Sequence, residues 1–196
     1  KELDAKFMYF STDYVFPGTG TTPYVEEDAT GPSNFYGLTK LEGEQAVKEL
    51  LTKYFTLRIS WVFADHGHNF IRTMLRLSET HDTLTVVNDQ IGSPTYCPDV
   101  AQLVCEMIRT EQYGTYHVTN EGLCSWYDFA VEIFRKAGKK VTVKPVTSEE
   151  YGASKAVRPK NSRMSKDKLV QAGFDRLPPW QDALTRFLKN VGEYRL

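Results

Sequence analysis

The chain has 196 residues, of which 41% are hydrophobic and 25% are charged, as in ordinary globular proteins. This length allows one sizeable core, or one domain with a small lobe attached. The formal net charge of -1 gives no electrostatic footprint for nucleic acid or for an anionic membrane, so we expect neither as a partner.

The three cysteines are odd in number and show no Cys-x-x-Cys spacing. This pattern favours reduced thiols in a cytoplasmic protein over a disulfide framework. No apolar run approaches the ~20 residues that a membrane-spanning helix needs.

In chain order, the first element is an apolar run at residues 7–10, which suits a strand buried on both faces of a parallel sheet. A loop rich in Gly, Pro, Thr and Asp follows, and residues 35–54 then predict a long helix. Residues 55–63 are a second candidate for a buried strand.

Helix and strand patterns go on alternating after this point. Helices are expected at residues 69–80, 98–110 and 125–138, the last one capped by Ser125 and stopped at Gly138. Strands are expected at residues 84–89 and 114–120. This alternation predicts an α/β fold in which right-handed βαβ units build a parallel sheet with helices on both faces.

Two pentapeptides place a tyrosine four residues before a lysine: "YGLTK" at residues 36–40 and "YGASK" at residues 151–155. On a helix these two positions share one face. An ammonium close to a phenol favours the phenolate, which gives a group that can donate and accept a proton near neutral pH. Only "YGLTK" begins a predicted helix, so we expect Tyr36 and Lys40 to be functional and "YGASK" to have a loop role.

Hydroxyl side chains follow the first predicted strand at Ser11 and Thr12. The carboxyl end of a parallel strand is where open α/β sheets place their ligands. A phenol–ammonium pair and a hydroxyl suit the reduction of a carbonyl group, because its oxygen needs a proton and a hydrogen bond as hydride arrives at carbon.

Four ordered motifs carry a family resemblance: "STDYVFPGTGTTPYVEED", "NFYGLTKLEGEQAV", "LRISWVF" and "NDQIGSPTY". With them the chain resembles the extended short-chain dehydrogenase/reductase family, and within it the dTDP-4-dehydrorhamnose reductases. The resemblance runs from about residue 6 to the C-terminus, with weaker motifs such as "VRPKNS" after residue 96. Tyr14 stands where the sugar-nucleotide dehydratases of the superfamily typically have a glutamate, which disfavours dehydration.

The resemblance implies a role for each matching residue. Thr12, Tyr36 and Lys40 would be catalytic, with Tyr36 as the general acid for a sugar 4-keto oxygen. Lys40 would hold the nicotinamide ribose and tune Tyr36, which makes both residues cofactor contacts. Thr12, Asp13 and Trp61 would contact the sugar.

The implied reaction is reduction of the 4-keto group of dTDP-4-dehydro-6-deoxy-L-mannose to dTDP-L-rhamnose, with NADPH or NADH, in cell-surface polysaccharide biosynthesis. A non-catalytic regulatory subunit that resembles the β subunit of methionine adenosyltransferase stays open, as does another epimerase or reductase of the superfamily. A homodimer and a bound magnesium ion also stay open, although no carboxylate cluster suggests a metal site.

The resemblance also implies a division of the chain. Residues 1–140 would form the C-terminal portion of a Rossmann-like nucleotide-binding domain that carries the catalytic residues, with substrate-lobe insertions. Residues 141–196 would form mainly a small α+β substrate-binding lobe. No glycine-rich dinucleotide fingerprint followed by a helix occurs in the sequence, and "GTGTTP" reads as a turn. We therefore expect the 196-residue chain to lack a pyrophosphate cradle and to have little reductase activity alone.

Overall fold

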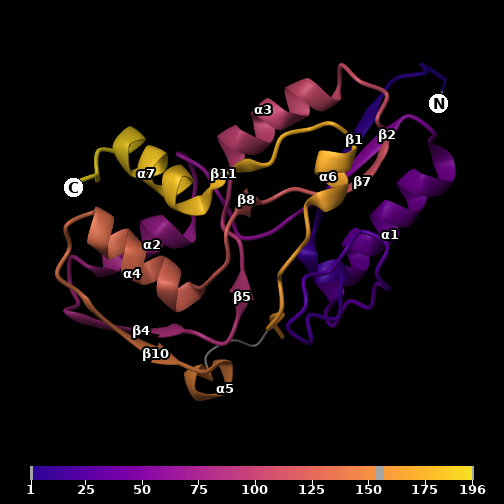
Figure 1. Cartoon of the computed structure of the whole chain (residues 1–196). Helices are drawn as coiled ribbons and strands as arrows, with labels where there is room; N and C mark the ends of the chain where they lie inside the picture. Colours follow the sequence, from indigo (N-terminus) through magenta and orange to yellow (C-terminus); the bar gives the residue numbers. More distant parts are fainter. Residues whose placement is uncertain (1, 153–156, 196) are drawn as a thin grey trace.

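A computed structural model describes residues 2–152 and 157–195. Its main sheet has three parallel strands in the order β1-β2-β7 (Figure 1), which are β1 (Phe7–Thr12), β2 (Tyr54–Ile59) and β7 (Gly114–His117). Strands β1 and β2 pair in register from Phe7 opposite Tyr54 to Thr12 opposite Ile59. Because the strands are parallel, their carboxyl ends lie at the same edge of the sheet.

Helices cover both faces of this sheet. Helix α1 (Phe35–Leu50) connects β1 to β2 and lies on one face, where Glu44 bonds to Arg58 of β2. Helices α3 (Cys97–Met107) and α6 (Asp167–Gln171) cover the other face, and their apolar side chains pack with Phe55 and Leu57 of β2. The alternation of these strand residues between the two faces follows from the two-residue period of a strand.

Within the described residues, β1 lies at the edge of the sheet, and its apolar run does not have the burial on both faces that it predicts. Phe7 and Phe10 are each 45% exposed. Among the strands that the structure describes, only β2 pairs with β1, so the outer edge of β1 is not covered by another strand. An unbroken apolar run does not distinguish a central strand from an edge strand.

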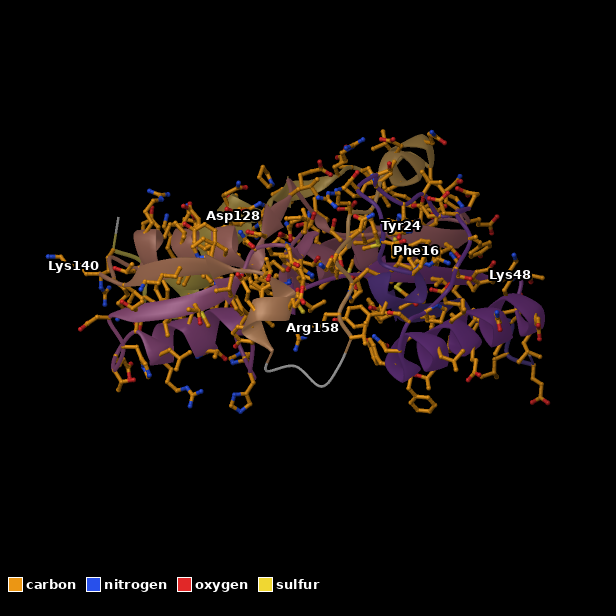
Figure 2. The ribbon with its side chains drawn as sticks, turned by 90° about the horizontal axis from the view of Figure 1, so that it is seen from below. Phe16, Tyr24, Lys48, Asp128, Lys140 and Arg158 are labelled. Atoms are coloured by element: carbon orange, nitrogen blue, oxygen red, sulfur yellow. The ribbon has the colours of Figure 1, made fainter. Side chains whose placement is uncertain are left out.

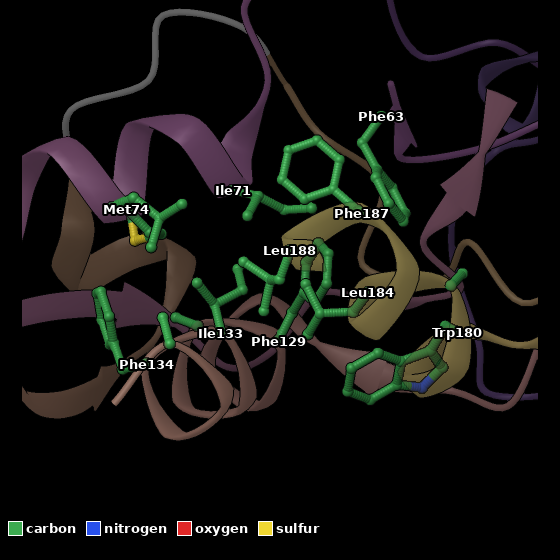
Figure 3. Packing of buried hydrophobic residues seen from close by; sticks show 14 of the residues in the cluster. Phe63, Ile71, Met74, Phe129, Ile133, Phe134, Trp180, Leu184, Phe187 and Leu188 are labelled. Atoms are coloured by element: carbon green, nitrogen blue, oxygen red, sulfur yellow. The ribbon is translucent and has the colours of Figure 1, made fainter. Parts of the chain in front are cut away.

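A second group of elements packs beside the sheet. Its parallel strands β4 (Thr83–Val87) and β10 (Thr142–Val146) pair with each other, and three helices complete it, namely α2 (Phe70–Leu77), α4 (Trp126–Lys136) and α7 (Trp180–Asn190). Figure 3 shows side chains of these helices converging on one core, in which Ile71, Ile133 and Phe187 are fully buried. A separate apolar cluster fills the space between the main sheet and α3.

Short elements connect these two parts. They are η1 (Asp13–Val15), β3 (Val62–Phe63), β5 (Ile91–Gly92), β6 (Thr95–Tyr96), β8 (Asn120–Glu121), β9 (Cys124–Ser125), α5 (Ser148–Tyr151) and β11 (Leu177–Pro179). The pairs are β3 with β6, β5 with β9 and β8 with β11. The strand expected at residues 55–63 is divided into β2 and β3, because Trp61 between them has a positive φ of 48° that no extended strand can accommodate.

Helix α4 begins and ends as predicted. The Ser125 hydroxyl accepts a hydrogen bond from the Asp128 N–H, and the Asp128 carboxylate accepts one from the Ser125 N–H. This reciprocal capping box satisfies donors that the first turn would otherwise leave unpaired. Gly138 follows the helix with φ 63°, a conformation that glycine adopts without steric cost.

The predicted α/β class, with a Rossmann-like parallel sheet and helices on both faces, is confirmed. No helix in residues 2–152 and 157–195 is long and apolar enough to cross a membrane. The division of the chain near residue 140 stays a prediction.

Candidate functional site

The site begins where β1 ends, at Thr12 and Asp13. The Thr12 hydroxyl donates a hydrogen bond to Asp13 Oδ1 over 3.0 Å and accepts one from the Tyr14 N–H over 3.2 Å. This local bonding caps the single turn η1 and ends the strand. The side chains that the sequence predicts for sugar contact are thus fixed at the carboxyl edge of the main sheet.

Asp13 is only 3% exposed, and its second carboxylate oxygen faces Ser162. The Ser162 hydroxyl donates to Asp13 Oδ2 over 2.5 Å. Burial raises the pKa of the Asp13 carboxyl to about 6, although the hydrogen bonds from Ser162 and Thr12 oppose that rise. A carboxyl group in this position changes charge close to physiological pH.

The segment that carries Ser162 is tied to the loop between β1 and α1. In that loop, the rings of Phe16 and Tyr24 stack with centroids 4.3 Å apart. Figure 2 labels both residues next to each other, seen from below. The Asn161 amide donates to the carbonyl oxygens of Thr19 and Thr22 over 3.1 and 2.9 Å. These contacts bring a residue from the "VRPKNS" motif to the end of the first strand.

Tyr36 is the second residue of α1 and is 55% exposed. The Asn34 side chain caps this helix by accepting from the Gly37 N–H over 2.8 Å. Gly37 lies so close to η1 that a Cβ atom there would come within 2.2 Å of the Tyr14 carbonyl oxygen. Because the helix start rests on η1, the rings of Tyr36 and Tyr14 meet edge to face with centroids 5.6 Å apart.

Lys40 lies one turn further along α1 and packs on Tyr9 of β1. Its Nζ atom is 4.3 Å from the centroid of the Tyr9 ring, within the range of a cation–π interaction. The Tyr9 hydroxyl also donates to the Lys40 carbonyl oxygen over 3.3 Å. Tyr9 therefore contacts both the backbone and the ammonium group of the predicted catalytic lysine.

Trp61 stacks on Trp126, with ring centroids 3.8 Å apart and ring planes 14° from parallel. Its ring edge also lies against Gly92, where a Cβ atom would come within 3.0 Å of Trp61 Cε2 and of Ser162 Cβ. The absence of a side chain at Gly92 thus lets Trp61 and Ser162 approach each other. The strained backbone of Trp61 is of the kind that folded proteins keep at functional sites.

A buried charged layer holds α1 on the sheet behind these residues. Arg58 Nη2 donates to Glu44 Oε2 over 2.7 Å, and its Nη1 donates to the Glu26 carbonyl oxygen over 3.2 Å. Glu26 in turn accepts from the backbone N–H of His117. Burial lowers the pKa of His117 to about 3, so its ring is neutral, and its Nδ1 bonds to the Ser165 carbonyl oxygen rather than pairing with Glu26 at 3.9 Å.

Only two of the predicted site residues, Thr12 and Asp13, bond directly to each other. Tyr36 is connected to them through Tyr14, and Trp61 through Gly92 and Ser162. Lys40 contacts Tyr9 instead. The sequence reading missed Ser162, Tyr9 and Trp126 as neighbours of the site. For Ser162 the signal in the sequence is the "VRPKNS" motif, which carries the resemblance only weakly.

The other motifs lie outside this constellation. Tyr151 ends the short helix α5, and Gly152 caps that helix with φ 58°. The rest of "YGASK" falls at residues 153–155, outside the described residues. In "GTGTTP", Gly18 and Gly20 both have φ 74°, a left-handed conformation that glycine adopts without steric cost.

The resemblance implies two ligands, a nicotinamide cofactor and a magnesium ion, and the side chains of the site fit them differently. The phenol of Tyr36 and the ammonium of Lys40 are hydrogen-bonding groups that fit the ribose hydroxyls of a nicotinamide cofactor. For a metal ion the fit is absent: within the part of the chain that the structure describes, no group of three or more His, Cys, Asp or Glu side chains could hold one. Magnesium is therefore not supported by these residues.

The parallel sheet with helices on both faces gives this chain the Rossmann-like α/β fold of the short-chain dehydrogenase/reductase type. The sequence matches the family described as RmlD substrate binding domain over residues 1–193. The chain belongs to this family, and the resemblance that the motifs indicated is confirmed.

Named relatives support the same assignment. The spore coat polysaccharide biosynthesis protein SpsK of Bacillus subtilis is 44% identical over 188 residues, covering 95% of this chain and 65% of the relative. The dTDP-4-dehydrorhamnose reductase of Escherichia coli K12 is 40% identical over 203 residues, covering 97% of this chain and 67% of the relative. The chain thus spans about two thirds of the length of these curated relatives.

A solved structure is similar over the same extent. It is the dTDP-4-dehydrorhamnose reductase of Bacillus anthracis in complex with NADP, which is 46% identical to this chain and superposes with a TM-score of 0.93. The similarity covers 96% of this chain and 67% of that structure.

Proposed function

We propose that this chain carries the catalytic and sugar-binding side chains of a dTDP-4-dehydrorhamnose reductase. The reaction is reduction of the 4-keto group of dTDP-4-dehydro-6-deoxy-L-mannose to dTDP-L-rhamnose. The observation that carries the proposal is the seating of the Tyr36 helix on the Thr12–Asp13 turn, through Gly37 and the contact between Tyr14 and Tyr36. The substrate comes from the name of the E. coli relative at 40% identity.

The nicotinamide cofactor, when bound, supplies the hydride. We take it to be NADP(H), because the B. anthracis relative is described in complex with NADP. Tyr36 and Lys40 would hold its ribose. The name of the B. subtilis relative refers to polysaccharide biosynthesis, and we place the reaction of this protein in that context.

The side chains of this chain divide the remaining work. Tyr36 donates the proton that the reduced keto oxygen needs, and its 55% exposure leaves the phenol accessible to a substrate. Lys40, four residues later on α1, brings a positive charge to the same face of the helix. Thr12, Asp13 and Trp61 hold the sugar ring in place beside the phenol.

A matched pair of substitutions tests this function. Tyr36→Phe removes the proposed acid, whereas Tyr151→Phe changes the look-alike pentapeptide on α5. With NADPH and dTDP-4-dehydro-6-deoxy-L-mannose, Tyr36→Phe should lower kcat by about 10²- to 10⁴-fold, the usual contribution of a general acid. Tyr151→Phe should leave kcat unchanged.

The assay uses the full natural protein. It follows the oxidation of NADPH and identifies the sugar product by mass spectrometry. Calorimetry with dTDP-L-rhamnose measures sugar binding independently of turnover. The proposal is wrong if neither sugar nucleotide binds, or if Tyr36→Phe and Tyr151→Phe have equal turnover.

A further inference from the structure

The Asp13 carboxyl group lies between two hydroxyl groups, one from the neighbouring Thr12 and one from Ser162, which is distant in the sequence. Thr12 donates to Oδ1 over 3.0 Å and Ser162 donates to Oδ2 over 2.5 Å. All three residues are buried, with exposed fractions of 5%, 3% and 2% for Thr12, Asp13 and Ser162. Water is therefore largely excluded from this group of side chains.

The number of protons in the group fixes the direction of each hydrogen bond. A hydroxyl has one proton and two lone pairs, and an ionised carboxylate can only accept. While Asp13 is ionised, the single proton of Thr12 is used on Asp13, and one lone pair of Thr12 accepts from the Tyr14 N–H. Thr12 then has one lone pair left for a ligand and no proton.

We propose that Asp13 and Ser162 set the hydrogen-bonding direction of Thr12, so that Thr12 accepts from a sugar hydroxyl while Asp13 is ionised and donates to a sugar ketone once Asp13 is protonated. This inference rests on the proposed function, since it concerns the same sugar site. In it, Ser162 is a positioning residue that acts through Asp13.

Substrate and product differ in whether the oxygen at the reacting carbon can donate a hydrogen bond to Thr12. The ketone oxygen of the substrate only accepts a hydrogen bond, whereas the hydroxyl of the product can also donate one. A protonated Asp13 can donate to Thr12, which frees the Thr12 proton for the ketone. The ketone therefore binds with uptake of one proton from solvent, and that proton returns to solvent after reduction, because the proton that stays on the product comes from Tyr36.

The surroundings of Asp13 allow this change of charge. The charge of Asp13 acts on the phenol of Tyr14 on η1, and a phenol ordinarily ionises near pH ~10. Burial raises the pKa of Tyr14 further, and the charges of Asp13 and Arg158 act on it in opposite directions. Figure 2 places Arg158 near the middle of the molecule. No ion pair to Asp13 occurs among residues 2–152 and 157–195, so burial is the main cause of its raised pKa of about 6.

The backbone holds Ser162 firmly enough for this role. Its N–H donates to the Ile91 carbonyl oxygen over 2.8 Å, and the Ile91 N–H in turn donates to the Lys160 carbonyl oxygen over 3.0 Å. The Ser162 side chain lies against Gly92, on the same side as Trp61. The residue that fixes Asp13 is thus packed beside the predicted sugar contact Trp61.

The test is a binding measurement, without NADPH, between about pH 5 and about pH 8. The dissociation constant of dTDP-4-dehydro-6-deoxy-L-mannose should rise about threefold to tenfold over this range, as expected for one hydrogen bond. That of dTDP-L-rhamnose should not rise. Calorimetry in two buffers of different ionisation enthalpy should detect proton uptake with the ketone alone.

Three variants separate the roles of the side chains. Asp13→Asn should abolish both the pH dependence and the proton uptake. Ser162→Ala removes a hydrogen bond to the ionised carboxylate, so the loss of ketone affinity should move to higher pH. Ser162→Thr keeps the hydroxyl and should restore the original profile, which a merely structural role for Ser162 would not require.

The results of these measurements distinguish failure of this inference from failure of the proposed function. If both sugar nucleotides bind with the same pH dependence and no proton uptake, this inference is overturned and the proposed function stands. If neither binds to folded protein, the proposed function itself fails. Circular dichroism of each variant identifies a fold defect, and Asp13→Asn supplies the decisive comparison if Ser162→Ala does not fold.

Discussion

At the scale of single residues, the environment of Asp13 makes stability depend on pH. Its pKa is 3.8 in the reference state and about 6 when folded, so the folded protein binds the proton more tightly. The resulting stabilisation is fully present below about pH 3.8 and is lost as the pH rises through about 6. An ionised Asp13 is thus a cost that the folded state carries at neutral pH.

Replacing Asp13 by Asn should remove that cost. We compare the free energy of unfolding of Asp13→Asn with that of the original protein. The difference should shift in favour of the variant by up to about 3 kcal/mol as the pH rises from about 4 to about 8. Urea unfolding at the two pH values measures the difference. The exposed Asp175 provides the control, since Asp175→Asn should show no such trend, and an equal trend in both variants would refute the explanation.

Some contacts of these residues follow from local spacing in the sequence, whereas others depend on tertiary packing. Tyr36 and Lys40 can be proposed as a pair from the sequence, because a spacing of four residues on a helix brings two side chains to one face, which is a local rule. Ser162 is 149 residues away from Asp13 along the chain, and no spacing rule connects them. Trp61 was identified by resemblance, but its positive φ and its stacking on Trp126 depend on tertiary packing.

At the scale of elements, the approach of α1 to β1 depends on Gly43. A Cβ atom there would lie 2.1 Å from the hydroxyl oxygen of Tyr9, the residue that also contacts Lys40. In an ordinary helix interior, Gly→Ala stabilises by about 1 kcal/mol. Here the added methyl group would displace Tyr9 from its place under the helix.

A double-mutant cycle tests this packing. Gly43→Ala should destabilise the original protein, whereas the same change in a Tyr9→Leu background should stabilise it by about 1 kcal/mol, because the obstructing phenol is gone. Thermal unfolding of the four proteins gives the coupling. Glu42→Ala, on the exposed surface of α1, should have the same small effect in both backgrounds, and additive effects at Gly43 and Tyr9 would contradict the proposed contact.

Periodicity in the sequence predicts the helices, but it does not predict where a strand lies within its sheet. The helices at α1, α3 and α4 were found where apolar side chains recur at helical spacing, and Ser125 identified the start of α4. Periodicity does not give the position of a strand within a sheet, so it does not predict the exposure of Phe7 and Phe10. That property depends on which strands pair, and pairing involves residues distant in sequence.

At the scale of the whole molecule, two apolar cores meet at a polar junction. One core contains Phe187 and the other contains Leu57. Between them, the guanidinium of Arg186 donates to both oxygens of Asp99 over 2.7 and 2.8 Å, and the Asn120 amide donates to the same carboxylate over 2.7 Å. Bonds of this kind fix the relative orientation of two packed groups and contribute less to stability than apolar burial does.

The two cores should therefore lose protection separately when each is damaged. Phe187→Ala should cost about 3–5 kcal/mol and Leu57→Ala about 2–5 kcal/mol, because each leaves a cavity in a fully buried position. Hydrogen exchange should rise mainly in β4, β10 and α4 for Phe187→Ala, and mainly in β1, β2 and β7 for Leu57→Ala. Equal acceleration across both groups in both variants would instead mean that the polar junction couples the cores into one cooperative unit, and the Tyr36 helix would then depend on Phe187 as strongly as on Leu57.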